Sequence, residues 1–345
     1  MKFDLLPGSG KFYKANLHTH TTVSDGKLTP AEAKEWFKSH GYSVVAYTDH
    51  EVIVPHPELC DDEFVALTSY EIAISKSLWT PFTKTFHLNL YFRDPKTTVS
   101  ATFNKGSVWG NAKAHVTDEM IAASTEKRLY TKEFIQWIVD TATKEGALVS
   151  YNHPVWSLQS KDDYSGIKGF FGVEWSNTGC VLEGYPDDMQ PIHDLLAEGE
   201  TMCYPLAVDD CHKLCDYGGG WVQIKAPALT HEDIYDALKR GDFYSSTGPE
   251  IYELYVEGDE VVIKTSEATQ ISFVTDCRHS QRVRATADAK ATEARFKLAK
   301  LLENHENAPE GHNCWFRIDV TDENGKVART KAYFAADLKA KMEEE

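Results

Sequence analysis

The sequence lacks the features of a membrane protein and of a nucleic-acid coat. No uninterrupted apolar stretch approaches the roughly 18 residues needed to cross a bilayer, and the first residues show neither the basic nor the apolar part of a signal peptide. Basic residues number 36 against 53 acidic ones, so the formal net charge is −17 with neutral histidines. We therefore expect a cytoplasmic protein that binds neither membranes nor long nucleic acids.

Paired cysteine motifs and nucleotide-binding loops are also missing. The 7 cysteines are scattered without a CxxC pair, which favours reduced thiols over disulfides or a zinc ribbon. Neither a glycine-rich phosphate loop nor a GxSxG motif occurs, so nucleotide-cofactor enzymes and serine hydrolases are not indicated. With 42% hydrophobic and 26% charged residues, the chain has the composition of an ordinary globular protein with room for a large and a smaller domain.

Short apolar runs in the first 212 residues lead into side chains that can bind metals. These runs predict seven strands, over residues 12–17, 44–47, 64–67, 86–92, 147–149, 170–173 and 206–208. The fourth run contains His87, and the others are followed by imidazole or carboxylate groups, namely His18, His20, Asp49, His50, Glu71, His153, Glu174, Asp209, Asp210 and His212.

Helix signals lie between several of these strands. Thr29-Pro30-Ala31-Glu32 combines an N-cap hydroxyl, a first-turn proline and a capping-box glutamate, and Gly41 ends that helix. Further helices are predicted over 132–144, 191–198 and 231–240. Alternating strands and helices predict an α/β fold with a parallel sheet. If that sheet closes into a barrel, its strand ends share one rim, where barrel enzymes assemble their sites.

Two parts of the chain break this alternation. Residues 94–128 are a long polar stretch with a short helix around 119–129, and such an insertion can be a lid or a tolerated surface loop. After Pro249, short strands joined by turns predict a small all-β, sandwich-like domain over residues 250–345, following a first domain over 1–249. The sequence leaves open whether residues 286–303 form a helix or a strand.

The pair His18-x-His20 suggests a metal site. Residues i and i+2 of one strand point to the same face, so both imidazoles can reach one cation. Asp25, in the turn Ser24-Asp25-Gly26, can add an oxygen ligand. Neutral imidazole and carboxylate without thiolate suit divalent zinc, manganese or iron, and they do not distinguish among them.

These motifs together resemble the PHP (polymerase and histidinol phosphatase) metallohydrolases. The matching segments, in order along the chain, are Asn16-Leu17-His18-Thr19-His20, Ser24-Asp25-Gly26, Tyr47-Thr48-Asp49-His50, Glu71, His87, Asn152-His153-Pro154 and Asp210-Cys211-His212. The resemblance continues through Gly220-Trp221-Val222 and residues 240–249 into the C-terminal domain, which makes the chain similar to the CehA/McbA-like subgroup.

The resemblance implies a distorted (β/α)7 barrel with three divalent metal ions at the strand ends. It assigns His18, His20, Glu71 and Asp210 to one metal; Glu71, as a bridge, with His87 and His153 to a second; and Asp25, His50 and His212 to a third. A hydroxide bridging the metals would be the nucleophile. Asp210 is preferred to Asp209 because the family motif is Asp-x-His. Asp210, His212 and Glu174 are the expected catalytic side chains, with Glu174 orienting a ligand.

Substrate-binding residues are less well defined by the sequence. Cationic groups that would suit a phosphate are Arg93, Arg128, Lys161 and Lys213, and His115 of the insertion is a further candidate. Trp79, Trp109, Trp156 and Trp175 lie near the motifs, where they would line an apolar pocket or simply pack in the core.

Three functions are consistent with this reading. The first is hydrolysis of a small phosphate ester, and the second is hydrolysis of a carbamate or aryl ester at the same metals. The third is a non-catalytic metal-binding module whose β domain recognises a partner or a carbohydrate. The sequence does not predict the oligomeric state.

Overall fold

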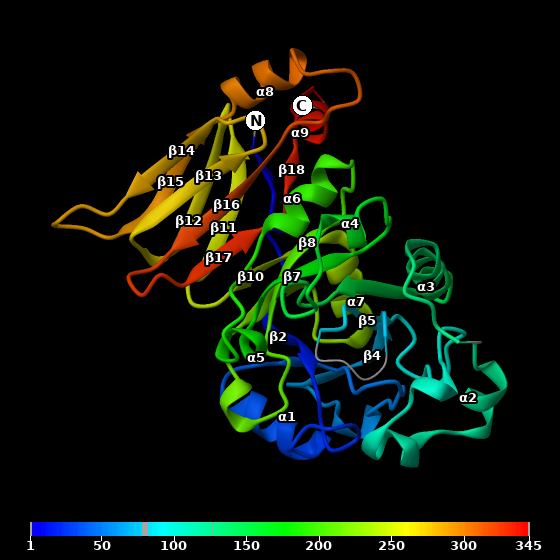
Figure 1. The fold of residues 1–345 in the computed structure, drawn as a ribbon. Helices are drawn as coiled ribbons and strands as arrows, with labels where there is room; N and C mark the ends of the chain where they lie inside the picture. Colours follow the sequence, from blue (N-terminus) through cyan, green and yellow to red (C-terminus); the bar gives the residue numbers. More distant parts are fainter. Residues whose placement is uncertain (1, 78–81, 126, 344–345) are drawn as a thin grey trace.

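A computed structural model describes residues 2–77, 82–125 and 127–343 as a mixed α/β region joined to a β-sandwich (Figure 1). Each of the seven predicted strands is present in the α/β region. Adjacent to one another in this order lie β2 (Lys11–Thr19), β3 (Val44–Tyr47), β4 (Val65–Ser75), β5 (Thr85–Phe92), β6 (Ala147–Tyr151), β7 (Gly172–Asn177) and β8 (Tyr204–Val208). The sheet continues beyond β2 through two strands that the sequence analysis missed, β9 (Trp221–Ala226) and β10 (Phe243–Ser246).

The sheet is neither fully parallel nor closed, which corrects the expectation of a barrel. β5 pairs antiparallel with both β4 and β6. Between β4 and β5, residues 76–84 are too few for the crossover of a dozen or more that a parallel pair requires. Beyond β8, Asp210 N donates to His18 O at 2.9 Å and His20 N donates to Cys211 O at 3.2 Å. These bonds bring the two ends of the strand row together, but within the described chain no continuous ladder joins β8 to β2.

The predicted helices are confirmed with small shifts at their ends. They are α1 (Pro30–Ser39), α3 (Lys132–Lys144), α6 (Gln190–Ala197) and α7 (His231–Arg240). The capping box of α1 is formed, since Glu32 N donates to Thr29 Oγ1 at 3.2 Å and Thr29 N donates to Glu32 Oε2 at 2.8 Å. α1, α3 and α7 pack against β3, β6 and β9, respectively. Shorter helices are η1 (Pro57–Leu59), α4 (Lys161–Tyr164), α5 (Thr178–Leu182) and η4 (Leu214–Asp216).

The insertion at 94–128 is folded against the α/β region. It contains the 3-10 helices η2 (Lys105–Ser107) and η3 (Gly110–His115), and α2 (Asp118–Ala123), which is shorter than the predicted helix. Phe103, Val108, Ala112 and Met120 form a small core with Val23 and Val52, which lie on loops beside predicted metal ligands. This apolar contact fixes the insertion next to the metal-competent side chains.

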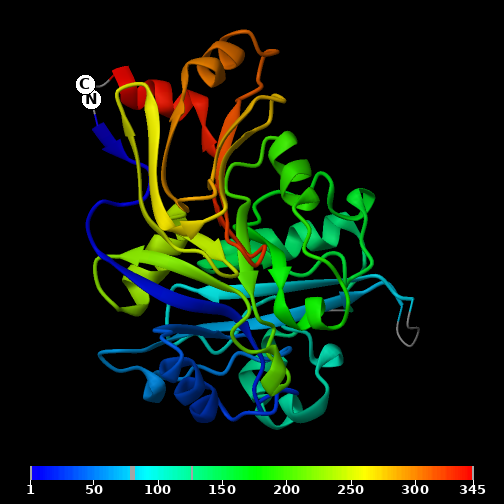
Figure 2. The same cartoon turned by 90° about the vertical axis from the view of Figure 1, so that its left-hand side faces the viewer.

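The region after Pro249 is mainly two antiparallel sheets with a shared core, and Figures 1 and 2 show it at one end of the molecule. One sheet contains β1 (Lys2–Asp4), β11 (Ile251–Glu257), β12 (Glu260–Ala268) and β15 (Ala291–Lys297). The other contains β13 (Gln270–Thr275), β14 (Ser280–Arg284), β16 (Trp315–Thr321), β17 (Val327–Thr330) and β18 (Tyr333–Phe334). Residues 286–303 include β15 and the start of α8 (Ala299–Glu306), and α9 (Ala335–Glu343) follows β18.

The sandwich is not detached from the α/β region. β17 pairs with β10, so one sheet runs through both regions, and β1, at the start of the chain, pairs with β11 in the sandwich. The division at residue 249 therefore remains a prediction. Among the described residues, no helix has the length and apolar character that crossing a bilayer would require.

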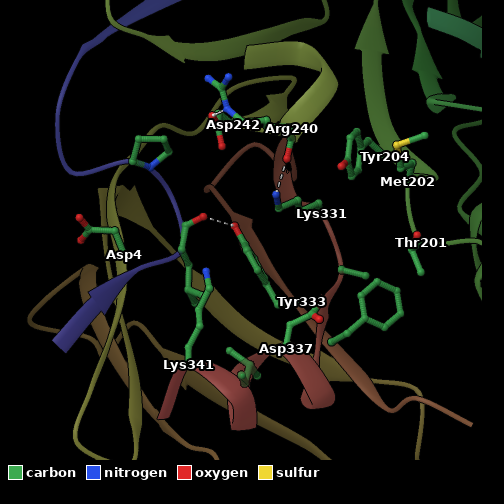
Figure 3. Close-up of a pocket in the computed structure, with 15 residues that line it drawn as sticks. Asp4, Thr201, Met202, Tyr204, Arg240, Asp242, Lys331, Tyr333, Asp337 and Lys341 are labelled. Carbon is green, nitrogen blue, oxygen red and sulfur yellow. Dashed lines mark hydrogen bonds and ion pairs between the residues drawn. The ribbon is translucent and has the colours of Figure 1, made fainter. Parts of the chain in front are cut away.

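A pocket of about 440 Å³ lies along this junction (Figure 3). Lys331 Nζ donates to the carbonyl oxygen of Arg240 at 2.8 Å, and Arg240 Nε lies 2.7 Å from Asp242 Oδ2. Tyr333 donates its hydroxyl to Leu5 O at 3.4 Å. Because these polar groups already pair with one another, the pocket is best understood as a seam between elements.

Candidate metal centre

The nine predicted metal-ligating side chains meet in one cluster. They come from β2, β4 and β5 and from the loops that follow β2, β3, β6 and β8, and they are His18, His20, Asp25, His50, Glu71, His87, His153, Asp210 and His212. Three overlapping groups within the cluster have their ligand atoms within 4.8 Å of one another. These groups are His20 with Asp25, His50 and His212; His18 with Glu71 and His153; and His18 with His20 and Asp210.

Glu71 lies at the middle of the cluster and is only 1% exposed. Its Oε1 is 3.1 Å from His87 Nδ1 and 3.3 Å from His18 Nε2. Its Oε2 is 3.0 Å from His50 Nδ1 and 3.4 Å from His20 Nε2. Both carboxylate oxygens thus face imidazole nitrogens, which is the arrangement expected of a bridging ligand.

The antiparallel pairing of β4 with β5 explains how His87 reaches Glu71. The register pairs Ala73 with His87, so the histidine lies two residues along the ladder from Glu71. His87 therefore enters the site from the beginning of its strand, whereas the predicted barrel would have presented it from a strand end. The local hairpin compensates for the reversed strand direction.

Asp210 approaches the cluster from the chain after β8. Its Oδ1 lies 3.2 Å from His18 Nε2 and 3.1 Å from His20 Nε2. The residue has φ of 54°, in the left-handed region that costs free energy for an aspartate, and His153 has φ of 27°. Backbone positions of this kind are found often at functional sites, and two of the nine cluster residues adopt one.

Asp25 and His212 form the solvent-facing part of the cluster. Asp25 Oδ2 lies 3.3 Å from His212 Nε2, and Asp25 Oδ1 lies 3.7 Å from His20 Nδ1. The ring of His20 stacks on that of His212 with centroids 4.2 Å apart. The side chain of Asp25 is 26% exposed and that of His212 is 33% exposed, so this part of the cluster is open to a substrate.

A second layer of side chains orients these groups. Glu174 Oε1 lies 2.7 Å from His18 Nδ1, and Ser157 Oγ lies 3.2 Å from His153 Nδ1. Asn152 Nδ2 donates to Glu71 Oε1 at 2.8 Å.

Asn177 links two carboxylates of the site. Its Nδ2 donates to Glu174 at 2.9 Å and to Asp210 at 3.1 Å. Such partners fix the tautomer and the direction of metal-binding groups. The sequence analysis proposed a role for Glu174 and missed Asn177, which no motif marked.

Two other buried carboxylates hold loops and stay outside the cluster. Asp209 accepts the backbone N–H groups of Gly218, Gly219 and Gly220 at 2.7–2.9 Å. Asp49 accepts the hydroxyls of Thr21 and Ser24 at 2.8 and 2.7 Å and so shapes the turn that carries Asp25. Asp209 is thus occupied by backbone donors, and the choice of Asp210 as the ligand stays a prediction.

The charges of the cluster oppose the effect of burial on its carboxyl groups. Burial alone would raise the pKa of Glu71, but the neighbouring imidazoles of His87, His18 and His50 hold it well below its ordinary value. The pKa of His20 falls to about 3, mainly because burial disfavours its cation and also because His212 and His50 lie beside it. Burial disfavours the cations of His18, His50, His153 and His212, but the surrounding carboxylates raise the pKa of these four imidazoles above its ordinary value, so they would release protons when they bind a metal.

The residues of the cluster fit a divalent metal ion. Among the described residues, His50 Nδ1, Glu71 Oε2 and Asp210 Oδ1 are buried without a hydrogen-bond partner. Glu71 Oε2 and His50 Nδ1 lie 3.0 Å apart, and Asp210 Oδ1 lies 3.1 Å from His20 Nε2, but these contacts lack hydrogen-bond geometry. Since buried polar atoms normally have partners, a cation bound among them would satisfy all three. Nitrogen and carboxylate oxygen donors without thiolate suit zinc, manganese or iron.

The cluster forms the floor of a cleft of about 370 Å³ whose walls include Trp109 and Trp156. The ring of Trp109, from the insertion, lies 5.3 Å from that of His50, and the ring of Trp156 lies 5.0 Å from that of His153. A neighbouring hollow of about 350 Å³ shares Trp156, Asp210 and His212 with the cleft and includes Lys213. The site is therefore a small open cleft with aromatic walls.

The other predicted substrate-binding residues lie elsewhere. Arg93 pairs with Glu232 at 2.9 Å on α7, and Lys161 pairs with Asp194 at 3.1 Å. Arg128 is buried against Glu51, with Nη1 2.7 Å from Oε2. His115 ends η3 and does not line the cleft. Trp175 is buried and donates to Ser245 Oγ at 2.9 Å, while Trp79 falls outside the described residues.

Comparison with known proteins finds only distant likenesses. No family model and no curated protein match the chain. It is similar to a two-domain Bacteroides vulgatus protein containing a predicted PHP-like metal-dependent phosphoesterase, with 13% identity and a TM-score of 0.44 over 96% of this chain and 98% of that one. A candidate metal-dependent phosphoesterase from Bifidobacterium adolescentis has 14% identity and a TM-score of 0.40 over 68% and 96% of the two chains. An amidohydrolase from Chromobacterium violaceum, with bound sulfate and no metal, has 16% identity and a TM-score of 0.39 over 66% and 96%. Likenesses of this size identify no family, and the side chains of the site carry the functional inference.

Proposed function

We propose that this chain is a metal-dependent hydrolase of the PHP type that cleaves a small phosphate ester. The observation that carries the proposal is the cluster of nine His and carboxylate side chains, in which three overlapping groups have their ligand atoms within 4.8 Å of one another. Its position at the floor of an open cleft supports catalysis over a purely structural role.

The proposed ligand sets for three divalent ions follow the assignments of the sequence analysis. His18, His20, Glu71 and Asp210 would hold one ion, Glu71 with His87 and His153 a second, and Asp25, His50 and His212 a third. When bound, such ions supply Lewis acidity, which polarises substrate oxygens and acidifies water.

The protein itself keeps the ligands ready for that role. Glu174 and Ser157 engage the Nδ1 atoms of His18 and His153, so the Nε2 atoms of both rings face Glu71. The backbone carbonyl of Asp210 lies 3.0 Å from His212 Nδ1 and leaves Nε2 of that ring toward Asp25. We infer that Asp210 and His212 act at the reacting centre and that Glu174 acts by positioning His18.

Lys213 supports a phosphorylated substrate. Lys213 lines the hollow that also contains His212 and Asp210, and the residue is exposed. The other proposed cations are occupied, because Arg93, Arg128 and Lys161 each pair with a carboxylate. An exposed cation beside the cluster suits the peripheral oxygens of a phosphate. The cleft volume of about 370 Å³ suits a small molecule better than a polymer.

A second candidate function is hydrolysis of an aryl ester or carbamate at the same centre. The rings of Trp109 and Trp156 favour it, since both border the cleft and can contact a flat apolar leaving group. A third possibility, from another class, is a metal-binding module whose sandwich recognises a partner or a carbohydrate. The open cleft over the cluster argues against this third function.

Release of nitrophenol from matched substrates distinguishes these functions. Manganese-loaded protein is offered nitrophenyl phosphate, a nitrophenyl phosphodiester, nitrophenyl acetate and a nitrophenyl carbamate. His50→Ala removes a cluster imidazole, and His40→Ala is the matched control because His40 is an exposed residue that stacks on Trp36.

We expect turnover of the phosphates that His50→Ala abolishes and His40→Ala preserves. Turnover of only the acetate or carbamate would favour the second function. If no substrate is turned over in the presence of metal, the hydrolase proposal fails and the binding module becomes the better explanation.

A further inference from the structure

A second group of metal-competent side chains lies in the sandwich. Asp276 and Cys277 directly follow β13, and Cys314 directly precedes β16. β13 and β16 are antiparallel neighbours, and their register pairs Thr275 with Phe316. The end of one strand therefore meets the beginning of the other. One carboxylate oxygen and the two sulfur atoms lie within 4.8 Å of one another.

Further polar groups surround these atoms. His312 Nε2 lies 2.8 Å from Asp276 Oδ2. Asn304, on α8, donates its amide to Cys277 Sγ at 3.0 Å. Cys314 is only 2% exposed, and the side chain of Asp276 is 11% exposed, whereas that of His312 is 43% exposed. The group thus has a buried thiol, a nearly buried carboxylate and an imidazole at its open side.

We propose that Cys277, Cys314, Asp276 and His312 form a second metal site, for zinc or a similarly thiophilic divalent ion. A tetrahedral zinc ion with bonds of about 2.0–2.3 Å places its ligand atoms about 3.3–3.8 Å apart. The mutual distances within 4.8 Å among three of the atoms are compatible with closure around such an ion. His312, exposed and already in contact with Asp276, supplies the fourth ligand.

The surroundings favour a metal over a disulfide between the same two cysteines. A disulfide needs neither a carboxylate nor an imidazole, yet the Asp276 carboxylate lies within 4.8 Å of both sulfur atoms here, and the imidazole of His312 contacts that carboxylate. An amide that donates to a sulfur atom, as Asn304 does, is a typical outer partner of a metal-bound thiolate. The four side chains form an N, O and S donor set that occurs in zinc proteins.

The proposed site has a different chemistry from the centre in the α/β region. Thiolate ligands select soft or borderline ions, while the nine residues of the α/β centre offer only nitrogen and oxygen. With four protein ligands the sandwich site leaves no open position, so it serves structure. It connects the chain after β13 to the segment before β16, next to α8, and would hold that end of the sandwich together.

Cobalt substitution separates the two centres in the intact protein. Cobalt bound by thiolates shows charge-transfer absorption in the near ultraviolet, and a centre without thiolate does not. We expect this absorption in reduced wild-type protein. Cys277→Ser and Cys314→Ser should each lose the absorption and bind about one zinc equivalent less than wild type. His312→Ala should weaken zinc binding, and His50→Ala should leave the absorption intact.

Cys203→Ser is the matched control, since Cys203 is also buried, at 3% exposed, but lies in the hydrophobic core of the α/β region and belongs to neither group of metal-competent side chains. Cys277→Ser and Asp276→Asn keep the test decisive if the buried Cys314→Ser variant does not fold. Absence of the absorption in wild type, or its persistence in Cys277→Ser, would overturn the proposal. A disulfide between the two cysteines would also overturn it. In that case, protein prepared without reductant would contain no zinc at this site and would have two fewer free thiols, which reduction would restore. Nitrophenol release is recorded on the same samples, so failure of this site is distinguished from failure of the hydrolase.

Discussion

Nδ1 of His18 lies 2.7 Å from Oε1 of Glu174, and both side chains are completely buried. Because Glu174 accepts the proton on Nδ1, the opposite nitrogen of His18 is left facing Glu71 and Asp210. Glu174 is thus linked to metal binding through His18 and is not itself one of the predicted metal ligands.

We expect Glu174→Ala to weaken metal binding by about 10- to 100-fold, the usual cost of losing such an outer partner. Glu174→Gln keeps a hydrogen-bond acceptor and should lose less. Affinity is measured by competition with a chelator, and Glu63→Gln, at an exposed position, is the control. Equal affinities for Glu174→Ala and the control would show that His18 does not depend on Glu174.

Arg128 connects the insertion to the residue that follows His50. Its Nη1 lies 2.8 and 2.7 Å from the two carboxylate oxygens of Glu51, and its Nη2 donates to Thr102 O at 3.0 Å. Removing one member of a buried ion pair leaves the other charge uncompensated. We expect Arg128→Ala to lower the free energy of unfolding by about 3–5 kcal/mol, measured by urea denaturation.

Arg93→Ala is the matched control for that change, because Arg93 pairs with Glu232 at the surface, where such pairs contribute about 0–1 kcal/mol. Similar losses for the two variants would contradict the structural role of Arg128. The ion pair with Glu51 also explains why Arg128 is not available to a substrate in this conformation.

The apolar runs predicted the strand row and marked many side chains near the cluster for a physical reason, whereas the choice of the nine ligands came from the resemblance to the PHP metallohydrolases. Apolar runs followed directly by His or Asp mark strands that end in a site, and these features are local. β9 and β10 were missed because they carry polar residues, such as Gln223, Lys225 and Ser245, among their apolar ones. The antiparallel direction of β5 follows from a short connection, which the apolar pattern alone does not report.

Contacts between distant parts of the chain could not be predicted. Arg128 and Glu51 are 77 positions apart, and the same charge pattern is equally compatible with an exposed arginine. Cys277 and Cys314 form no short motif either, so their proximity depends on the pairing of β13 with β16. Single-sequence reasoning identified chemically competent residues, while the structure assigned their partners.

His231 should make the protein less stable in acid. The amide N–H of Thr68 donates to His231 Nε2 at 3.4 Å, which requires that nitrogen to be unprotonated. Burial lowers the pKa of His231 to about 4, although Asp94 opposes the shift. Between pH 6.5 and 4 the unfolded chain binds a proton that the folded chain does not, so stability falls as the pH falls through this window.

The contribution is at most about 3 kcal/mol at pH 4, because a pKa difference of one corresponds to about 1.4 kcal/mol. His231→Gln keeps an acceptor for Thr68 and should flatten the dependence of unfolding free energy on pH between 6.5 and 4. His40→Gln, at an exposed histidine, should leave the slope unchanged. A slope for His231→Gln identical to that of wild type would contradict this assignment.

Trp109 brings the insertion into contact with a predicted metal ligand, since its ring lies 5.3 Å from that of His50, and 46% of the residue is exposed. An aromatic contact contributes about 0.5–1.5 kcal/mol beyond simple burial. For a nitrophenyl substrate, Trp109→Ala should therefore raise KM by roughly 2- to 12-fold while metal content stays the same. Trp137→Ala removes a tryptophan of similar exposure, 40%, from α3, away from the cleft, and should leave KM unchanged.

Loss of metal in Trp109→Ala would instead mean that the ring supports His50, and an unchanged KM would mean that the insertion does not contact the substrate. The distinction matters because only a contact with the substrate would make the insertion a determinant of specificity.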